Sequence, residues 1–230
     1  MFKLIQKEKK LFIISLVFLF VPLFFLYIYT QFNPDIIYSI SSEYQASTMK
    51  RNFNPELNSS RISTDFSTDI SMLKFYIINN AGMGLGIFIA GLLLGAGSLL
   101  LLAYQGVSMG ILIGYVAQLG YGENLWPYII GHSSVELLAA VFSAVGGLII
   151  GRSLLKPDQS SRVKSFIAAF IASLAYIIVA VLFFVLAAII ETFWSPNINI
   201  SSSAKYVAGS VLWLSIIYLF YAAFNKRESL

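Results

Sequence analysis

The side chains best suited to chemistry are a few polar groups set in apolar sequence. His132, the only histidine of the chain, stands four residues before Glu136. On a helix this spacing puts both side chains on one face, where a hydrogen bond or an ion pair can form. Proton or substrate handling is one interpretation of the pair. The other is structural, with the pair holding its helix against the helix that carries Asn79 and Asn80.

Polar groups in apolar segments define the predicted functional cluster. An ionisable side chain near the centre of a membrane costs about 2.5 to 3.5 kcal/mol on insertion scales, and it usually faces a bundle interior, a partner or water. Gln105 adds an amide, and Glu191 adds a carboxylate near a membrane boundary, where an ion pair would also explain it. The cluster comprises Asn79, Asn80, Gln105, His132, Glu136 and Glu191.

Several well-known catalytic patterns are missing from the sequence. A zinc protease of the H-E-x-x-H type needs two histidines, and this chain has one. The chain has no cysteine, which excludes disulfides, thiolate metal sites and thiol nucleophiles. It also has no glycine-rich phosphate-binding loop of the Walker A type. We therefore predict no catalytic residue, no metal site, no cofactor and no enzymatic activity.

The composition indicates a membrane protein. Hydrophobic residues make up 58% of the chain and charged residues 11%, whereas soluble domains carry about 25% charged residues. The apolar runs are long enough to cross a hydrocarbon core, which takes roughly 20 helical residues. The net charge of +4 comes from basic residues beside these runs, so we expect the lipid bilayer as a partner and no nucleic acid. The predicted fold is an all-α polytopic membrane helical bundle of about six membrane segments.

Four regions follow along the chain. Residues 1–30 form a basic segment and the first transmembrane helix, and residues 31–74 form a polar extracytoplasmic loop. Residues 75–224 form the helical membrane core, and residues 225–230 form a cytoplasmic tail.

The polar loop ends in a pattern of helical period. Apolar residues recur there at steps of three and four, which predicts an amphipathic helix at the membrane surface, although an ordinary helical loop fits equally well. These residues are Ile62, Phe66, Ile70, Leu73 and Ile77.

Glycines predict where helices pack closely. In the apolar segment from Phe75 to Ala103, pairs of glycines stand four residues apart, which lets a neighbouring backbone approach. We expect this segment to be central in the bundle. The predicted packing glycines are Gly82, Gly86, Gly91, Gly95, Gly106, Gly110, Gly114, Gly147 and Gly151.

The stretch from Gly106 to Leu119 has two interpretations. As a helix it is only about 21 Å long, which is shorter than a hydrocarbon core of about 30 Å. We predict either a short buried span or a re-entrant segment.

The distribution of basic residues predicts the orientation. Arg152, Lys156, Arg162 and Lys164 lie in one short loop, which favours a cytoplasmic location for that loop. Six crossings from a cytoplasmic N-terminus place ten of the 15 Lys and Arg residues inside and five outside. We therefore predict a multi-pass protein of the plasma (inner) membrane with both termini cytoplasmic.

The order and spacing of several motifs resemble the stage II sporulation protein M family of prokaryotic integral membrane proteins, over roughly Phe75 to Phe224. One departure is Gln105, where we would expect Asn before the glycine. The matching residues are Asn79-Asn80, Tyr104-Gln105-Gly106, Gly110, Gly114, Gly131-His132, Glu136-Leu137, Gly151-Arg152 and the stretch Ile190-Glu191-Thr192-Phe193-Trp194-Ser195-Pro196.

The resemblance implies an all-helical membrane protein without established catalytic residues. The founding member of that family works with peptidoglycan-degrading partners during engulfment, and related members occur with circular bacteriocin production and export. We therefore expect a non-enzymatic scaffold that recruits protein partners in the membrane or envelope, in cell-envelope or peptidoglycan remodelling. The alternative is a transport component for a small solute, lipid or peptide, with a polar intramembrane path. Homo-oligomerisation stays open.

Overall fold

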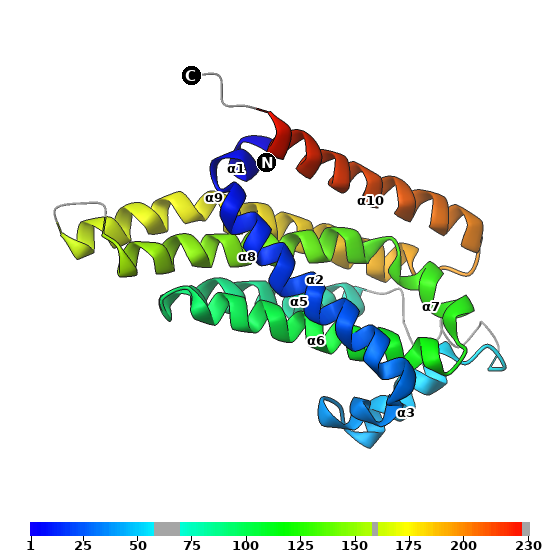
Figure 1. Cartoon of the computed structure of the whole chain (residues 1–230). Coiled ribbons are helices and arrows are strands. Elements are labelled where there is room, and N and C mark those ends of the chain that lie inside the picture. The colour runs from blue at the N-terminus through cyan, green and yellow to red at the C-terminus, as the bar shows by residue number, and fades with distance from the viewer. Residues whose placement is uncertain (58–69, 158–160, 227–230) are drawn as a thin grey trace.

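The computed structural model describes residues 1–57, 70–157 and 161–226. These parts of the chain are almost entirely helical and contain no strand, and six helices are long and apolar enough to cross a membrane (Figure 1). The prediction of an all-α polytopic bundle is therefore confirmed. The elements are α1 (Phe2–Lys7), α2 (Lys9–Phe32), η1 (Pro34–Ser39), α3 (Glu43–Phe53), α5 (Ile70–Ile89), η2 (Ala90–Leu92), α6 (Ala96–Gln118), α7 (Gly122–Ile129), α8 (His132–Leu155), α9 (Arg162–Ile189), η3 (Ile190–Trp194) and α10 (Ser202–Asn225).

Helix α8 is the centre of the bundle. The apolar stretch of α8 is 100% buried, whereas the corresponding stretch of α5 and η2 is only 33% buried. It contacts α2, α5, α6, α9 and α10, and small residues such as Ala139, Ala140 and Gly147 leave room for neighbours on several sides. The expectation that the 75–103 segment would be central is therefore wrong.

The second and third spans meet at a turn that the sequence analysis placed inside one helix. The chain leaves η2 and reverses through Leu94 and Gly95, whose φ angles of 55° and 82° are left-handed. Because this turn carries no polar side chain, hydropathy does not mark it. Helix α6 therefore starts at Ala96 and has 23 residues, or about 34 Å. The prediction of a short or re-entrant segment from Gly106 to Leu119 is wrong.

Contacts between α2 and α6 show that the two helices run in the same direction. A Cβ at Gly106 would meet the backbone of Leu19, and a Cβ at Gly110 would meet the backbone of Leu23. Each step of four residues along α6 thus matches a step of four along α2. Two parallel spans need an odd number of crossings between them, which agrees with α5 crossing in the opposite direction.

The other predicted packing glycines divide into two groups. Gly91 lies against Gly147, and Gly95 lies against Gly151. The connection between α5 and α6 therefore packs closely on α8. Gly114 lies against the end of α2. At Gly82 and Gly86, in contrast, a Cβ would meet nothing within 4 Å. These two residues mediate no close helix contact within the described chain, and the packing prediction is wrong for them.

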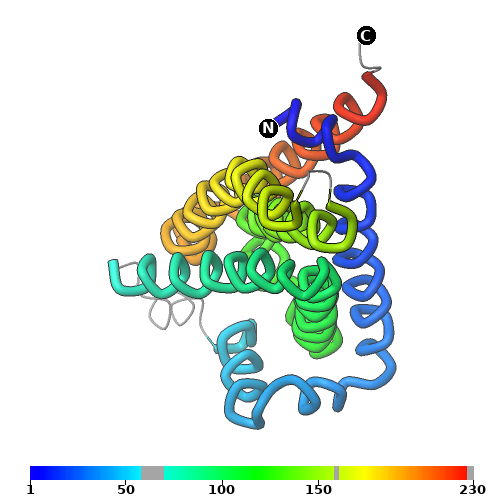
Figure 2. The backbone as a smooth tube through the Cα atoms, turned by 90° about the vertical axis from the view of Figure 1, so that its left-hand side faces the viewer, coloured from blue at the N-terminus to red at the C-terminus, as the bar shows by residue number. Residues whose placement is uncertain are grey.

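The segment after α2 forms a cap at one edge of the bundle. Elements η1 and α3 pack around Ile37, Ala46 and Phe53 against α6 and α7, and a capping box of Ser42 and Gln45 starts α3. Figure 2 shows α3 beside α5 and α6, on the side away from α9 and α10.

The predicted amphipathic helix falls only partly within the described residues. Ile62 and Phe66 lie outside them, whereas Ile70, Leu73 and Ile77 belong to α5. The structure therefore leaves the surface helix as a prediction.

Helix α1, at the N-terminus, lies beside the C-terminal end of helix α10 (Figure 1). Helix α1 contacts α10, and the Lys9 Nζ atom donates to the carbonyl oxygens of Phe224 and Lys226 at 3.1 and 3.2 Å. Six crossings would place both of these segments on the same side of the membrane, which agrees with their contact.

Candidate functional site

Two helical pairs of polar residues face each other where α8 begins and α9 ends. His132 and Glu136 lie on the first turns of α8. Glu191 lies in η3, which continues α9, and Ser195, four residues later, follows η3. His132 Nδ1 and Ser195 Oγ are 2.9 Å apart. One ring nitrogen of His132 and one carboxylate oxygen from each glutamate lie within 4.8 Å of one another. The two antiparallel helices thus bring four polar groups to one place.

A wide helical turn fixes this end of α9. The Ser195 amide donates to the Ile190 carbonyl at 2.8 Å, a bond across five residues that is typical of a π-helix. The carbonyl of Ser195 accepts a second bond, from Lys205 Nζ at 2.7 Å. Ser195 is therefore held by three polar contacts, and the Ile190–Pro196 motif that carried the resemblance has a structural role.

The two asparagines of α5 approach the same site. Asn80 is buried, and its Nδ2 atom donates to Glu191 Oε2 at 3.5 Å, a long bond. Asn79 donates in turn to Asn80 Oδ1 at 3.2 Å. A short series of amide donors thus ends at a carboxylate, which amide donors stabilise in its charged form.

Two tyrosines complete the wall of the site and were missed in the sequence. The ring of Tyr128 meets the ring of His132 edge-on at 5.4 Å, and its hydroxyl lies 3.3 Å from the Tyr76 hydroxyl. Burial raises the pKa of Tyr128 well above its usual range, so the phenol keeps its proton. Tyr128 stands four residues before His132, and that helical spacing was a signal available in the sequence.

All six residues of the predicted cluster line one cavity of about 610 Å³. Its polar end is formed by the asparagines, His132 and the two glutamates, and Gln105 of α6 also lines the cavity. The remaining wall is largely apolar and is built by α3, α5, α6 and α7. Its apolar members include Met49, Phe53, Met72, Phe75, Met109, Leu112, Ile113, Val116, Leu125 and Ile129.

The electrostatics of the polar end are unusual. If Glu136 and Glu191 are both charged at a separation of no more than 4.8 Å, they repel by at least about 3.5 kcal/mol at an effective dielectric constant of about 20. Neither forms an ion pair with any residue that the structure describes. A proton or a bound cation between them would remove this repulsion.

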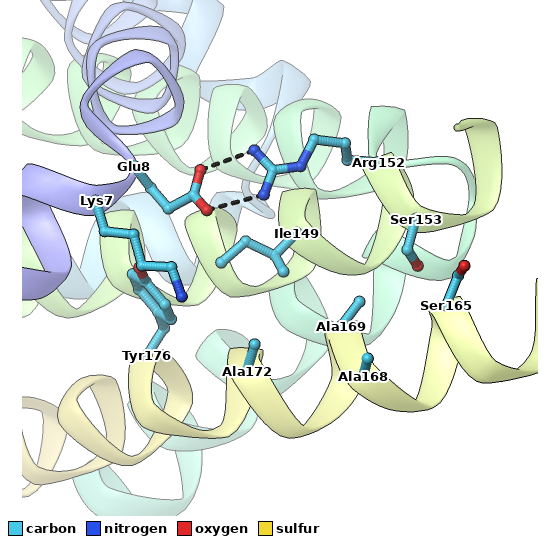
Figure 3. Close-up of a pocket in the computed structure, with 10 residues that line it drawn as sticks. All are labelled: Lys7, Glu8, Ile149, Arg152, Ser153, Ser165, Ala168, Ala169, Ala172 and Tyr176. Carbon is cyan, nitrogen blue, oxygen red and sulfur yellow. Dashed lines mark hydrogen bonds and ion pairs between the residues drawn. The ribbon is translucent and has the colours of Figure 1, made fainter. Parts of the chain in front are cut away.

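The basic loop predicted to set topology lies at the far end of α8. Arg152 forms a bidentate pair with Glu8, with both N–O distances at 2.8 Å (Figure 3). Lys156, Arg162 and Lys164 are exposed. Arg152 is thus also a tertiary contact between α8 and the N-terminal segment, which the sequence analysis missed.

Comparison with known proteins agrees with this architecture. The family model described as Stage II sporulation protein M matches residues 12–196. The match begins within α2 and stops before α10, whereas the sequence motifs indicated a resemblance over roughly Phe75 to Phe224. No curated protein and no solved structure matches the chain significantly. Since the match covers most of the chain, this protein belongs to the stage II sporulation protein M family.

Proposed function

We propose that this protein is a component of membrane transport, and that the cavity holds an amphipathic solute such as a lipid or an apolar peptide. The observation that supports the proposal is the convergence of His132, Glu136, Glu191 and Asn80 at one end of a cavity formed between membrane helices. Ionisable groups are costly in a membrane and commonly line a pathway or a binding site.

The division of the cavity wall suggests the class of solute. Side chains of α6 such as Met109, Leu112 and Ile113 offer an apolar surface, and Phe75 of α5 lines the same cavity. A hydrocarbon or apolar side chain would lie there, while a polar or cationic head group would reach the two glutamates. Binding sites of this kind combine a largely apolar wall with a few placed polar groups.

We propose an orientation in which the cavity lies toward the outer side of the membrane. Arg152 contacts the N-terminal segment, and that segment contacts the C-terminal helix, so most of the basic residues gather at one end, which we propose is cytoplasmic. His132 stands 20 residues from Arg152 along α8, about 30 Å away. The solute would therefore meet the polar cluster in the outer half of the bilayer.

A transport assay tests the proposal. The full chain is reconstituted in liposomes that carry either a fluorescent lipid or a fluorescent amphipathic peptide, and movement across the bilayer is followed by quenching from outside. We expect Glu136→Gln and Asn80→Ala to slow the movement of one of these probes at least about tenfold, the effect of losing one good polar contact of about 1.4 kcal/mol. Glu123→Gln, on the exposed face of α7, is the matched control. Folded variants that transport both probes as the unmodified chain does would sink the proposal.

A non-enzymatic scaffold in envelope remodelling is the second candidate. It is favoured by the cap, because Tyr38 and Tyr44 are 52% and 77% exposed there, and exposed aromatic residues are common in protein interfaces. Tyr38→Ala, at a cap position outside the cavity lining, should then abolish co-purification of an envelope partner without slowing transport. In both candidates we propose that the chain catalyses no covalent reaction.

A further inference from the structure

We infer that His132, Glu136 and Glu191 form a binding site for one divalent transition-metal ion. The site forms the polar end of the cavity, so the inference deepens the proposed function and rests on it for its role, whereas the binding itself is a separate property. The three ligand atoms already lie within 4.8 Å of one another.

The donor set fits zinc-like ions. Zinc binds imidazole nitrogen at about 2.0 to 2.1 Å and carboxylate oxygen at about 2.0 to 2.2 Å, usually in a tetrahedron. Ligand atoms around such an ion are about 3.4 Å apart by this geometry, so modest side-chain rotations would close the present arrangement. An imidazole with two carboxylates suits zinc, manganese or iron better than calcium or magnesium. Three protein ligands leave a fourth position for water or for the head group of a solute in the cavity.

The charge and the hydrogen bonding of the glutamates are the second observation. Glu136 is only 8% exposed, lines the cavity and accepts no hydrogen bond from any residue that the structure describes. A buried carboxylate without a partner is rare because its desolvation is costly. A divalent ion would give Glu136 a partner. Its charge of +2 would also balance the two negative charges of Glu136 and Glu191.

The surrounding contacts orient the ligands as metal sites require. Histidine ligands of metals usually donate from the other ring nitrogen to a fixed acceptor. The Ser195 hydroxyl, 2.9 Å from His132 Nδ1, is placed for this role, and Lys205 holds the backbone of Ser195. When Nδ1 donates to Ser195, Nε2 is the nitrogen with a free lone pair. Asn80 has the same orienting role for Glu191.

The prediction of no metal site was based on the absence of a second histidine. The third ligand instead comes from Glu191, which is 55 residues beyond Glu136 in the sequence. The two glutamates lie on opposite sides of the loop that joins α8 to α9, and the antiparallel packing of these helices brings them together. A proton shared between the two carboxylates is the competing account of the same geometry.

Titration with Co²⁺ distinguishes the two accounts. The full chain is purified in detergent with a tag that contains no histidine, is stripped with a chelator, and is titrated with Co²⁺ while its visible absorption is recorded. We expect one Co²⁺ per chain, displaced by Zn²⁺. His132→Ala, Glu136→Gln and Glu191→Gln should each weaken binding about 100-fold or more, and Ser195→Ala about tenfold. Glu123→Gln should bind as the unmodified chain does.

Two outcomes would overturn the inference. One is the absence of bound Co²⁺ in the unmodified, folded chain; the other is unchanged binding in the three ligand variants, which would leave the shared proton as the explanation. If the variants do not fold, pulsed electron paramagnetic resonance of Cu²⁺ in the unmodified chain replaces them. Because His132 is the only histidine, a signal from one imidazole nitrogen is expected, and its absence would also refute the site.

The binding assay uses detergent and no transmembrane gradient. If the unmodified chain transports a probe but binds no Co²⁺, the result would count against this inference alone. Intact metal binding without any transport would count against the proposed function alone.

Discussion

The packing of α6 on α2 depends on a glycine that cannot carry a side chain. At Gly110 a new Cβ would overlap the carbonyl oxygen of Leu23 and lie 3.1 Å from its carbonyl carbon and Cα. These are backbone atoms within a helix, so the two helices have to separate. We therefore expect Gly110→Ala to destabilise the protein.

Gly86→Ala is the matched control for this change. It also places alanine within a membrane helix, but its Cβ would meet nothing within 4 Å. Alanine is favoured over glycine in a helix by up to about 1 kcal/mol, and overpacking costs about 1 to 3 kcal/mol. Because the helix preference is common to both variants, their difference isolates the overpacking. We expect Gly86→Ala to be more stable than Gly110→Ala by about 1 to 3 kcal/mol.

Unfolding in mixed micelles, followed by tryptophan fluorescence, measures this difference. Circular dichroism before unfolding verifies that both variants keep the helical content of the unmodified chain. Equal free energies of unfolding for the two variants would refute the close contact between α2 and α6, and with it the parallel arrangement of the first and third spans.

Two further changes test contacts at opposite ends of α8. Arg152→Ala leaves the 9% exposed Glu8 side chain without its bidentate partner. Because Arg152 itself is 51% exposed, we expect the free energy of unfolding to fall by about 1 to 3 kcal/mol, which is less than the cost of breaking a fully buried pair. The double variant with Glu8→Gln should recover part of this loss, and recovery of none of it would exclude the ion pair as the cause. Lys205→Met removes the donor to the Ser195 carbonyl and should cost about 1 to 3 kcal/mol of unfolding free energy; an unchanged value would show that the end of α9 does not need this contact.

The sequence predicted the candidate cluster better than it predicted the boundaries of the helices. The i, i+4 spacing of His132 and Glu136 is a local property, and helical periodicity is enough to place both on one face. The turn at Leu94 and Gly95 escaped detection because its side chains are apolar, and hydropathy marks a boundary only where polarity changes. Gly82 and Gly86 match the spacing of a packing motif, but the spacing alone does not predict whether another helix lies against that face.

Contacts between residues far apart in the chain could not be predicted from the sequence, for a different reason. Glu8 and Arg152 are 144 residues apart, and nothing in the spacing of either residue names its partner. The same holds for Asn80 and Glu191. Their contacts depend on how α2, α5 and α9 surround α8, which is a property of the whole packing rather than of any one helix.

Water access to the cavity is the most direct test of whether the polar cluster faces a solute path. The chain contains no cysteine, so Asn79→Cys and Gln105→Cys, both at cavity-lining positions, can be labelled individually in liposomes with a small charged thiol reagent. Ala180→Cys, at a fully buried position in α9, provides the matched control. We predict that positions 79 and 105 react much faster than position 180 in folded protein. Equal protection of all three would contradict a wet cavity and would make the polar cluster a structural contact.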